Sequence, residues 1–296
     1  MERLNLGPVS FSHIAYGMWR LGDDRDTSPA HVQAKIEACL AQGLTTLDQA
    51  DIYGGYTAEA LLGGCLRAAP HLRDKVEIVT KCGIIAPVGR HAAAQVKHYD
   101  TTAPHIIQSV ETSLKEMATG HVDLLLIHRP DPLMDHAETG AALDALVASG
   151  KVRAVGVSNF MPHDFTLLQS AMRERLVTNQ IELSLVHHLP FTNGELAFLQ
   201  ERAITPMAWS PLGGGRLFGS ENAGVTESLG RLAKANDVAP SSVAVAWLLA
   251  HPARIMPVIG TNRIERIRQI GEALKVRLGR QDWFELYTAA LGREVA

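Results

Sequence analysis

Four residues whose side chains hold or move protons stand at, or just after, the ends of apolar runs. Asp48 ends the run TTLD, and Tyr53 follows it in a glycine-rich stretch. Lys81 ends VEIVTK, and His128 ends HVDLLLIH. A carboxylate, a phenol, an ammonium group and an imidazole together form a site that can donate a proton. We interpret this set as suited to protonating a carbonyl oxygen while a hydride attacks its carbon.

The residue types indicate a role for each side chain. Reducing a carbonyl creates an alkoxide, so the transition state needs a proton donor and electrostatic stabilisation. A free phenol, with a pKa of about 10, is a poor acid near neutral pH. An ammonium group within about 4 Å would lower that pKa, and a carboxylate would keep the ammonium charged. We therefore assign Tyr53 as the acid, Lys81 and Asp48 as its tuning pair, and His128 as the donor that orients the carbonyl.

Because no side chain supplies a hydride, this chemistry requires a nicotinamide cofactor.

The elements that must position the site alternate along the chain. Strands are expected at residues 13–17, 45–48, 76–81, 121–128, 152–159, 178–184, 204–210 and 256–261. Helical patterns separate them, and several begin at a proline such as Pro29, Pro104 or Pro162. Strict alternation of strand and helix predicts parallel βα units.

The pattern favours a closed barrel over an open doubly wound sheet. The open sheet would carry a GxGxxG turn after its first strand, where this chain has YGMWRLG. We therefore predict an α/β fold, a single (β/α)8 TIM barrel. RLNL and VSFS flank Gly7-Pro8 and predict a β-hairpin cap, and an extra helix is expected at the C-terminus. In such a barrel the polar strand ends, including Ser158, Gln180, Ser210 and Thr261, converge on one mouth.

Composition excludes several classes of partner. The 28 basic and 31 acidic residues give a net charge of −3, and no basic block predicts a nucleic-acid partner. The longest apolar runs fall short of the ~20 residues of a membrane helix. Cys39, Cys65 and Cys82 fit no zinc or disulfide pattern, and the start of the chain has no secretory signal. We expect a cytoplasmic protein, a monomer or weak homo-oligomer, acting on a small-molecule carbonyl substrate.

Motifs along nearly the whole chain resemble one family. GYTAEALLG, TKCG, LLIHRPD, GVSNF, NQIELS, AWSPLGGGRL and VIGTNRIERI are together similar to the aldo-keto reductase superfamily, most closely to a bacterial branch of short-tailed oxidoreductases. The resemblance implies that residues 1–296 form one barrel domain that binds NADP(H) in an extended form. It also implies NADPH-dependent reduction of aldehydes or ketones to alcohols. Asp48, Tyr53, Lys81 and His128 match the family's catalytic four.

The resemblance further implies a set of cofactor contacts. By region, these are the carboxamide contacts Ser158, Asn159 and Gln180; the stacking ring of Trp209; the pyrophosphate loop with Ser210, Pro211, Leu212, Gly213, Gly215 and Arg216; and the 2′-phosphate segment with Gly260, Thr261, Asn262, Arg263 and Arg266. Gly17, Met18 and Trp19 complete the set, and Trp19 either lines the substrate pocket or packs under the barrel rim.

Two departures and two alternatives accompany this interpretation. Long-tailed relatives have a lysine where this chain has Gly260 or Thr261, so phosphate recognition would rest on Arg263 and Arg266. The long C-terminal loop that shapes substrate choice in many relatives is missing, which leaves the substrate open. One alternative is an NADP(H)-binding regulatory or sensor module with little turnover. The other, a metal-dependent hydrolase, is disfavoured because too few metal ligands stand at strand ends, and no metal site is expected.

Overall fold

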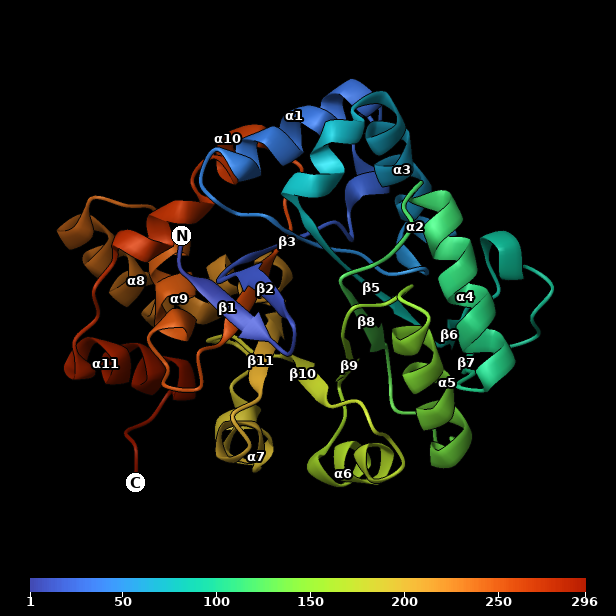
Figure 1. Cartoon of the computed structure of the whole chain (residues 1–296). Helices are drawn as coiled ribbons and strands as arrows, with labels where there is room; N and C mark the ends of the chain where they lie inside the picture. The colour runs from blue at the N-terminus through green and yellow to red at the C-terminus, as the bar shows by residue number, and fades with distance from the viewer.

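Eight parallel strands form a closed barrel in the computed structural model, which describes residues 1–296 (Figure 1). Each strand pairs with the next one along the chain, and the last pairs with the first. The barrel strands are β3 (Ala15–Gly17), β4 (Thr46–Asp48), β5 (Glu77–Cys82), β8 (Leu124–Ile127), β9 (Val155–Ser158), β10 (Leu176–Glu182), β11 (Thr205–Trp209) and β12 (Met256–Ile259). The predicted (β/α)8 barrel is confirmed, and each expected strand overlaps one of these.

Helices surround the barrel (Figure 1). They are α1 (Pro29–Leu40), α2 (Tyr53–Tyr56), α3 (Ala58–Ala68), α4 (Ala103–Glu116), α5 (His136–Ala148), α6 (Pro162–Ser170), α7 (Glu195–Glu201), α8 (Ala223–Asn236), α9 (Pro240–Leu249), α10 (Ile264–Ile267) and α11 (Arg280–Leu291). Helix α1 begins as its sequence predicts, with Pro29 in the first turn and the Ser28 hydroxyl accepting a hydrogen bond from the His31 N–H. None of the helices has both the length and the apolarity to cross a bilayer.

The strands are buried on both faces, which explains why they read as continuous apolar runs. In β8, Leu124 and Leu126 belong to a cluster of 12 buried residues inside the barrel. Leu125 and Ile127 belong to a cluster of 62 buried residues between the barrel and its helices. The alternation follows from the two-residue repeat of a strand, and it lets one short strand contribute to two cores.

An antiparallel hairpin closes the N-terminal end of the barrel. Strands β1 (Arg3–Leu6) and β2 (Val9–Ser12) pair as predicted and lie across the barrel (Figure 1). Its turn contains Gly7 with a φ of +60°, and a Cβ there would lie 2.8 Å from Val177 Cγ1. Glycine avoids both the unfavourable backbone conformation and the clash.

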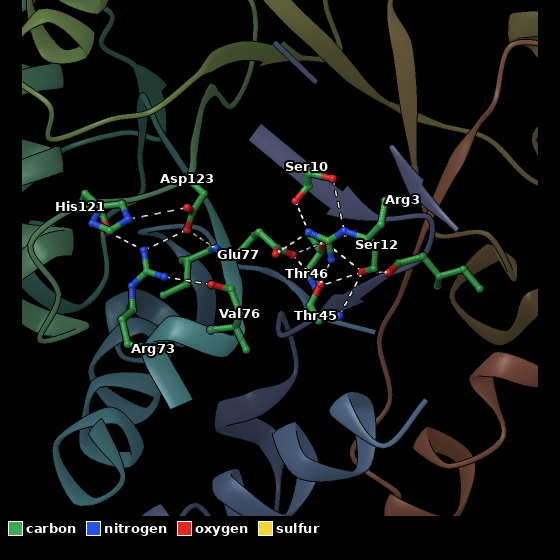
Figure 2. Close-up of polar contacts among 12 residues, drawn as sticks. Arg3, Ser10, Ser12, Thr45, Thr46, Arg73, Val76, Glu77, His121 and Asp123 are labelled. Atoms are coloured by element: carbon green, nitrogen blue, oxygen red, sulfur yellow. Dashed lines mark hydrogen bonds and ion pairs between the residues drawn. The ribbon is translucent and has the colours of Figure 1, made fainter. Parts of the chain in front are cut away.

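Polar contacts tie this hairpin to the strand starts beneath it (Figure 2). The Arg3 guanidinium donates to Glu77 Oε1 at 2.7 Å, and the Thr45 hydroxyl donates to Glu77 Oε2 at 2.6 Å. The Ser12 hydroxyl contacts the Thr46 hydroxyl at 3.0 Å. These contacts lie at the N-terminal ends of β4 and β5, opposite the end where the polar strand termini gather.

Two segments differ from the sequence prediction. The sequence RIERIRQIGEAL, residues 263–274, has a continuous helical pattern, but the structure divides it into α10 and a 3₁₀ helix, Ile270–Lys275. Residues 84–99 contain an antiparallel pair, β6 (Ile84–Ile85) with β7 (His98–Tyr99), and a 3₁₀ turn at Gly89–His91, none of which was predicted. This segment contains Pro87, Gly89 and three successive alanines and has no apolar repeat, so its pairing depends on distant contacts.

Candidate active site

The ammonium group of Lys81 is the centre of the polar cluster at the C-terminal mouth of the barrel. The side chain is fully buried and contacts Asp48 Oδ1 at 2.8 Å and Oδ2 at 2.9 Å. It also contacts the backbone carbonyl of Gln49 at 2.8 Å and the Tyr53 hydroxyl at 3.0 Å. Strands β4 and β5 are neighbours in the barrel, so two side chains far apart in the sequence form this ion pair.

The Tyr53 hydroxyl is oriented by this contact. An ammonium group only donates hydrogen bonds, so the phenolic oxygen accepts from Lys81. The phenolic proton is therefore left to point elsewhere. The ring of His128, at the end of β8, lies across from Tyr53 with its centroid 6.0 Å away and its plane at 74°. The structure thus brings together all four residues that the sequence singled out as catalytic candidates.

The surrounding protein sets the charge of the two central groups. Burial lowers the pKa of Lys81, but Asp48 and Tyr53 together raise it by more, so the pKa lies above its ordinary value. The lysine is therefore an ammonium at neutral pH. Burial raises the pKa of Tyr53, and Lys81 opposes this only in part. The direction is opposite to the lowered pKa expected from the sequence, because desolvation of the phenolate outweighs the nearby positive charge.

His128 is held in its neutral form. Burial, then Lys81 and Arg129, place its pKa well below the ordinary value. Its Nδ1 atom is buried without a hydrogen-bond partner. A neutral imidazole carries one N–H, and such a group can donate to a carbonyl oxygen without becoming charged.

The residues expected to hold a carboxamide form one connected network beside this cluster. Gln180 donates from Nε2 to Asp48 Oδ1 at 2.8 Å. The Ser158 hydroxyl donates to the Gln180 carbonyl at 2.9 Å and accepts from Asn159 Nδ2 at 2.7 Å. Trp209 donates from its indole N–H to Asn159 Oδ1 at 2.9 Å, which fixes the plane of its ring. The ends of β4, β9, β10 and β11 are therefore coupled.

The first strand contributes a close backbone approach and an exposed ring. A Cβ on Gly260 would lie 3.1 Å from the Gly17 carbonyl oxygen, so these two glycines let β3 and the segment after β12 come together. Met18 is buried in the core, with 1% of its surface exposed. Trp19 is 58% exposed at the rim. Of the two expectations for this tryptophan, the one that packs it under the rim is therefore wrong.

The loop after β11 has backbone geometry that only glycine adopts readily. The three glycines at 213–215 have φ values of +59°, +66° and +103°. Ser210, just before the loop, has a φ of +50°. Arg216 follows with 66% of its side chain exposed and Nη2 3.7 Å from Glu182 Oε1. Pro211 and Leu212 connect the strand to the glycines.

The segment after β12 is fastened to the neighbouring strand β3 and to the turn that follows it. The Tyr16 hydroxyl donates to the Thr261 carbonyl at 2.9 Å, and Asn262 Nδ2 donates to the Arg20 carbonyl at 2.6 Å. Arg263 and Arg266 remain exposed. Two exposed guanidinium groups beside polar backbone suit contact with a phosphate group.

Lys35 was missed by the sequence interpretation. Its side chain is fully buried, pairs with Asp24 and donates to Asn262 Oδ1 at 3.1 Å. A signal was present in the sequence: Lys35 lies on the same helical face as Val32, Ile36 and Cys39, which are all buried. A lysine on an apolar face implies a specific partner.

The fold and the site together define a barrel oxidoreductase. The chain belongs to the aldo/keto reductase family, whose model matches residues 13–289. It is 68% identical to a 6-dehydroglucose reductase of Agrobacterium fabrum over the whole of both chains. A 6-dehydroglucose reductase of Novosphingobium aromaticivorans is 42% identical over 99% of this chain and 96% of that protein. The crystal structure of the thermostable aldo-keto reductase Tm1743 with the inhibitor epalrestat matches with a TM-score of 0.82 and 26% identity, covering 98% of this chain and 100% of that one.

Proposed function

We propose that the protein reduces 6-dehydroglucose to glucose with NADPH, with Tyr53 as general acid. Two relatives, one 68% and the other 42% identical to this chain, are both named 6-dehydroglucose reductase. The substrate bears an aldehyde at C6, and its reduction gives a primary alcohol. The observation that carries the proposal is the contact of the Lys81 ammonium with both Asp48 and the Tyr53 hydroxyl.

The residues present fit a nicotinamide dinucleotide phosphate. Aldo-keto reductases use nicotinamide cofactors. Along the mouth of the barrel, amide side chains, glycine backbone and arginines stand in the order in which such a cofactor presents its carboxamide, its pyrophosphate and its terminal phosphate. The amides of Gln180 and Asn159 suit a carboxamide, and the glycines at 213–215 permit close approach of backbone N–H groups to phosphate oxygens. Arg263 and Arg266 suit a terminal phosphate. When bound, the cofactor supplies the hydride.

The chain's own residues supply the proton and the charge balance. Tyr53 donates its proton to the aldehyde oxygen as negative charge develops there, and the phenolate that results is stabilised by Lys81 at 3.0 Å. Its raised pKa keeps the phenol protonated until that oxygen becomes a stronger base. Asp48 holds Lys81 in place and charged. The neutral His128 donates to the same oxygen and orients the carbonyl.

The test compares wild type with Tyr53→Phe. Wild type should oxidise NADPH in the presence of 6-dehydroglucose and form glucose. The variant should lose turnover by about 10²-fold or more, because the acid is removed, while NADPH binding followed by tryptophan fluorescence stays within about twofold. Turnover of the variant within about tenfold of wild type would exclude the role of Tyr53. Tight NADPH binding by a wild type that reduces no aldehyde would favour a sensor instead.

A further inference from the structure

The backbone that follows Tyr53 is strained. Gly54, Gly55 and Tyr56 have φ values of +59°, +63° and +71°, three successive residues in the left-handed region. Glycine adopts this conformation readily, but for tyrosine it costs about 1–2 kcal/mol. A conformation of this kind persists only when contacts around it hold it, so the loop that carries the candidate acid depends on its surroundings.

The contacts of Tyr56 supply that support. The side chain is 5% exposed, and its hydroxyl donates to the Ile84 carbonyl at 3.0 Å. The same hydroxyl accepts from the Ala86 N–H at 2.9 Å. Ile84 and Ala86 lie just beyond Lys81 along the chain. Tyr56, in the loop that carries Tyr53, thus makes two hydrogen bonds to the segment that follows β5, the strand of Lys81.

Further packing holds the ring of Tyr56 in place. The Arg90 guanidinium lies 4.8 Å from its centroid, and the His91 ring meets it edge-on at 4.9 Å. Arg90 is itself paired with Glu116 Oε1 of α4 at 3.0 Å. A Cβ on Gly89 would lie 2.3 Å from the Gly55 carbonyl oxygen, so the 3₁₀ turn packs directly on the strained loop.

We propose that Tyr56 is a positioning residue that fixes the Tyr53 hydroxyl relative to the Lys81 ammonium; this rests on the roles proposed above for that pair. Lys81 is anchored by Asp48 and the Gln49 carbonyl, whereas the Tyr53 hydroxyl contacts Lys81 and no backbone group. The position of the phenol is therefore set by its backbone. Tyr56 ties that backbone to the chain beyond Lys81. The two segments that the Tyr53–Lys81 hydrogen bond joins are thus linked a second time.

The test is Tyr56→Phe, which keeps the ring and its packing but removes both hydrogen bonds. The Ile84 carbonyl and Ala86 N–H lose their shared partner, and the loop can shift. Because a displacement of about 1 Å can cost 10²-fold in rate, kcat should fall about 10- to 100-fold. The KM for the aldehyde and the Kd for NADPH should stay within about threefold, since the groups that bind them are untouched. Tyr287→Phe in α11 removes the hydroxyl of another largely buried tyrosine, whose ring packs on Trp283 and Phe191; it is the matched control and should retain wild-type kinetics.

The outcomes separate this proposal from the proposed function. If Tyr53→Phe is inactive but Tyr56→Phe keeps kcat within about threefold, the positioning role is wrong and the function stands. A variant that melts at lower temperature with unchanged kcat has lost only a structural contact, which also overturns the proposal. If Tyr53→Phe itself retains full turnover, the proposed function fails, and the positioning role fails with it.

Discussion

Glu59 illustrates, at the scale of one residue, how burial changes a carboxylic acid near the mouth. Its side chain is fully buried and accepts hydrogen bonds from the hydroxyls of Thr80, at 2.6 Å, and Ser113, at 2.9 Å. Burial raises its pKa from 4.5 to about 7, and the two hydroxyls oppose this only in part. Thr80 precedes Lys81, so this acid lies directly behind the candidate site.

The raised pKa of Glu59 makes stability depend on pH in a defined direction. Between pH 4.5 and about 7 the folded protein keeps this proton while the unfolded chain releases it. The contribution of Glu59 to stability is therefore greatest at low pH and is lost as pH rises through that range, by roughly 3 kcal/mol at most. Glu59→Gln should remove this loss, so the variant should gain about 2–3 kcal/mol relative to wild type between pH 4.5 and pH 8. Urea unfolding at both pH values measures it, and an equal difference at each pH would contradict it.

Residue types at strand ends were predictable from the sequence, whereas their environments were not. Asp48, Lys81 and His128 each follow an apolar run, and the parallel fold brings such ends together. The direction of the Tyr53 pKa was predicted wrongly, because it depends on how much protein surrounds the phenol. Tyr56 gave no signal at all, since its partners lie about thirty residues away and bond through the backbone.

At the scale of elements, Lys35 joins α1 to the segment after β12. Its ammonium group pairs with Asp24 and donates to Asn262 Oδ1, and Asn262 in turn donates to the Arg20 carbonyl. This chain of contacts holds the turn that precedes Arg263. If that turn meets the cofactor's phosphate as proposed, Lys35 determines how well the turn is preorganised.

Lys35→Met should therefore weaken NADPH binding about tenfold while kcat at saturating cofactor stays within about twofold. Fluorescence titration gives the Kd, and steady-state kinetics give kcat. The double variant Lys35→Met, Asp24→Asn checks that the effect does not come from a carboxylate left without its partner. Lys75→Met, which changes an exposed lysine, should leave the Kd as in wild type. An unchanged Kd for NADPH in Lys35→Met would show that the contacts of Lys35 with Asp24 and Asn262 do not affect cofactor binding.

Element types were largely predictable, and the failures have a common cause. Every barrel strand lies in a short apolar run, and the longer helices lie in the longer segments between these runs, so both were found from their alternation. The pairing of β6 with β7 and the 3₁₀ turn between them have no such repeat. Helix α10 ends after one turn although its sequence continues a helical pattern. In these segments contacts from other elements, rather than local preference, decide the conformation.

At the scale of the whole molecule, the two ends of the barrel have different tasks. Apolar packing at the N-terminal end of the barrel contributes to stability. The C-terminal end can therefore hold strained and polar groups, because stability and chemistry depend on separate contacts. The hairpin of β1 and β2 was predicted from its sequence, but its insertion was not. Leu4, Leu6 and Phe11 pack in the same interior cluster as Leu124 and Leu126 of the barrel. The hairpin is therefore part of the core rather than a loose cover.

Phe11→Ala tests this division. Phe11 is fully buried, so truncation should leave a cavity in the barrel floor and cost about 3–5 kcal/mol of unfolding free energy. The turnover of the folded fraction should stay within about twofold, because the cavity lies at the end opposite Lys81 and Tyr53. Phe284→Ala on α11, where the ring is 38% exposed, is the matched control and should cost much less. Urea unfolding measures the first effect, and activity per folded molecule measures the second. A large loss of turnover at full folding would mean that the two ends are coupled.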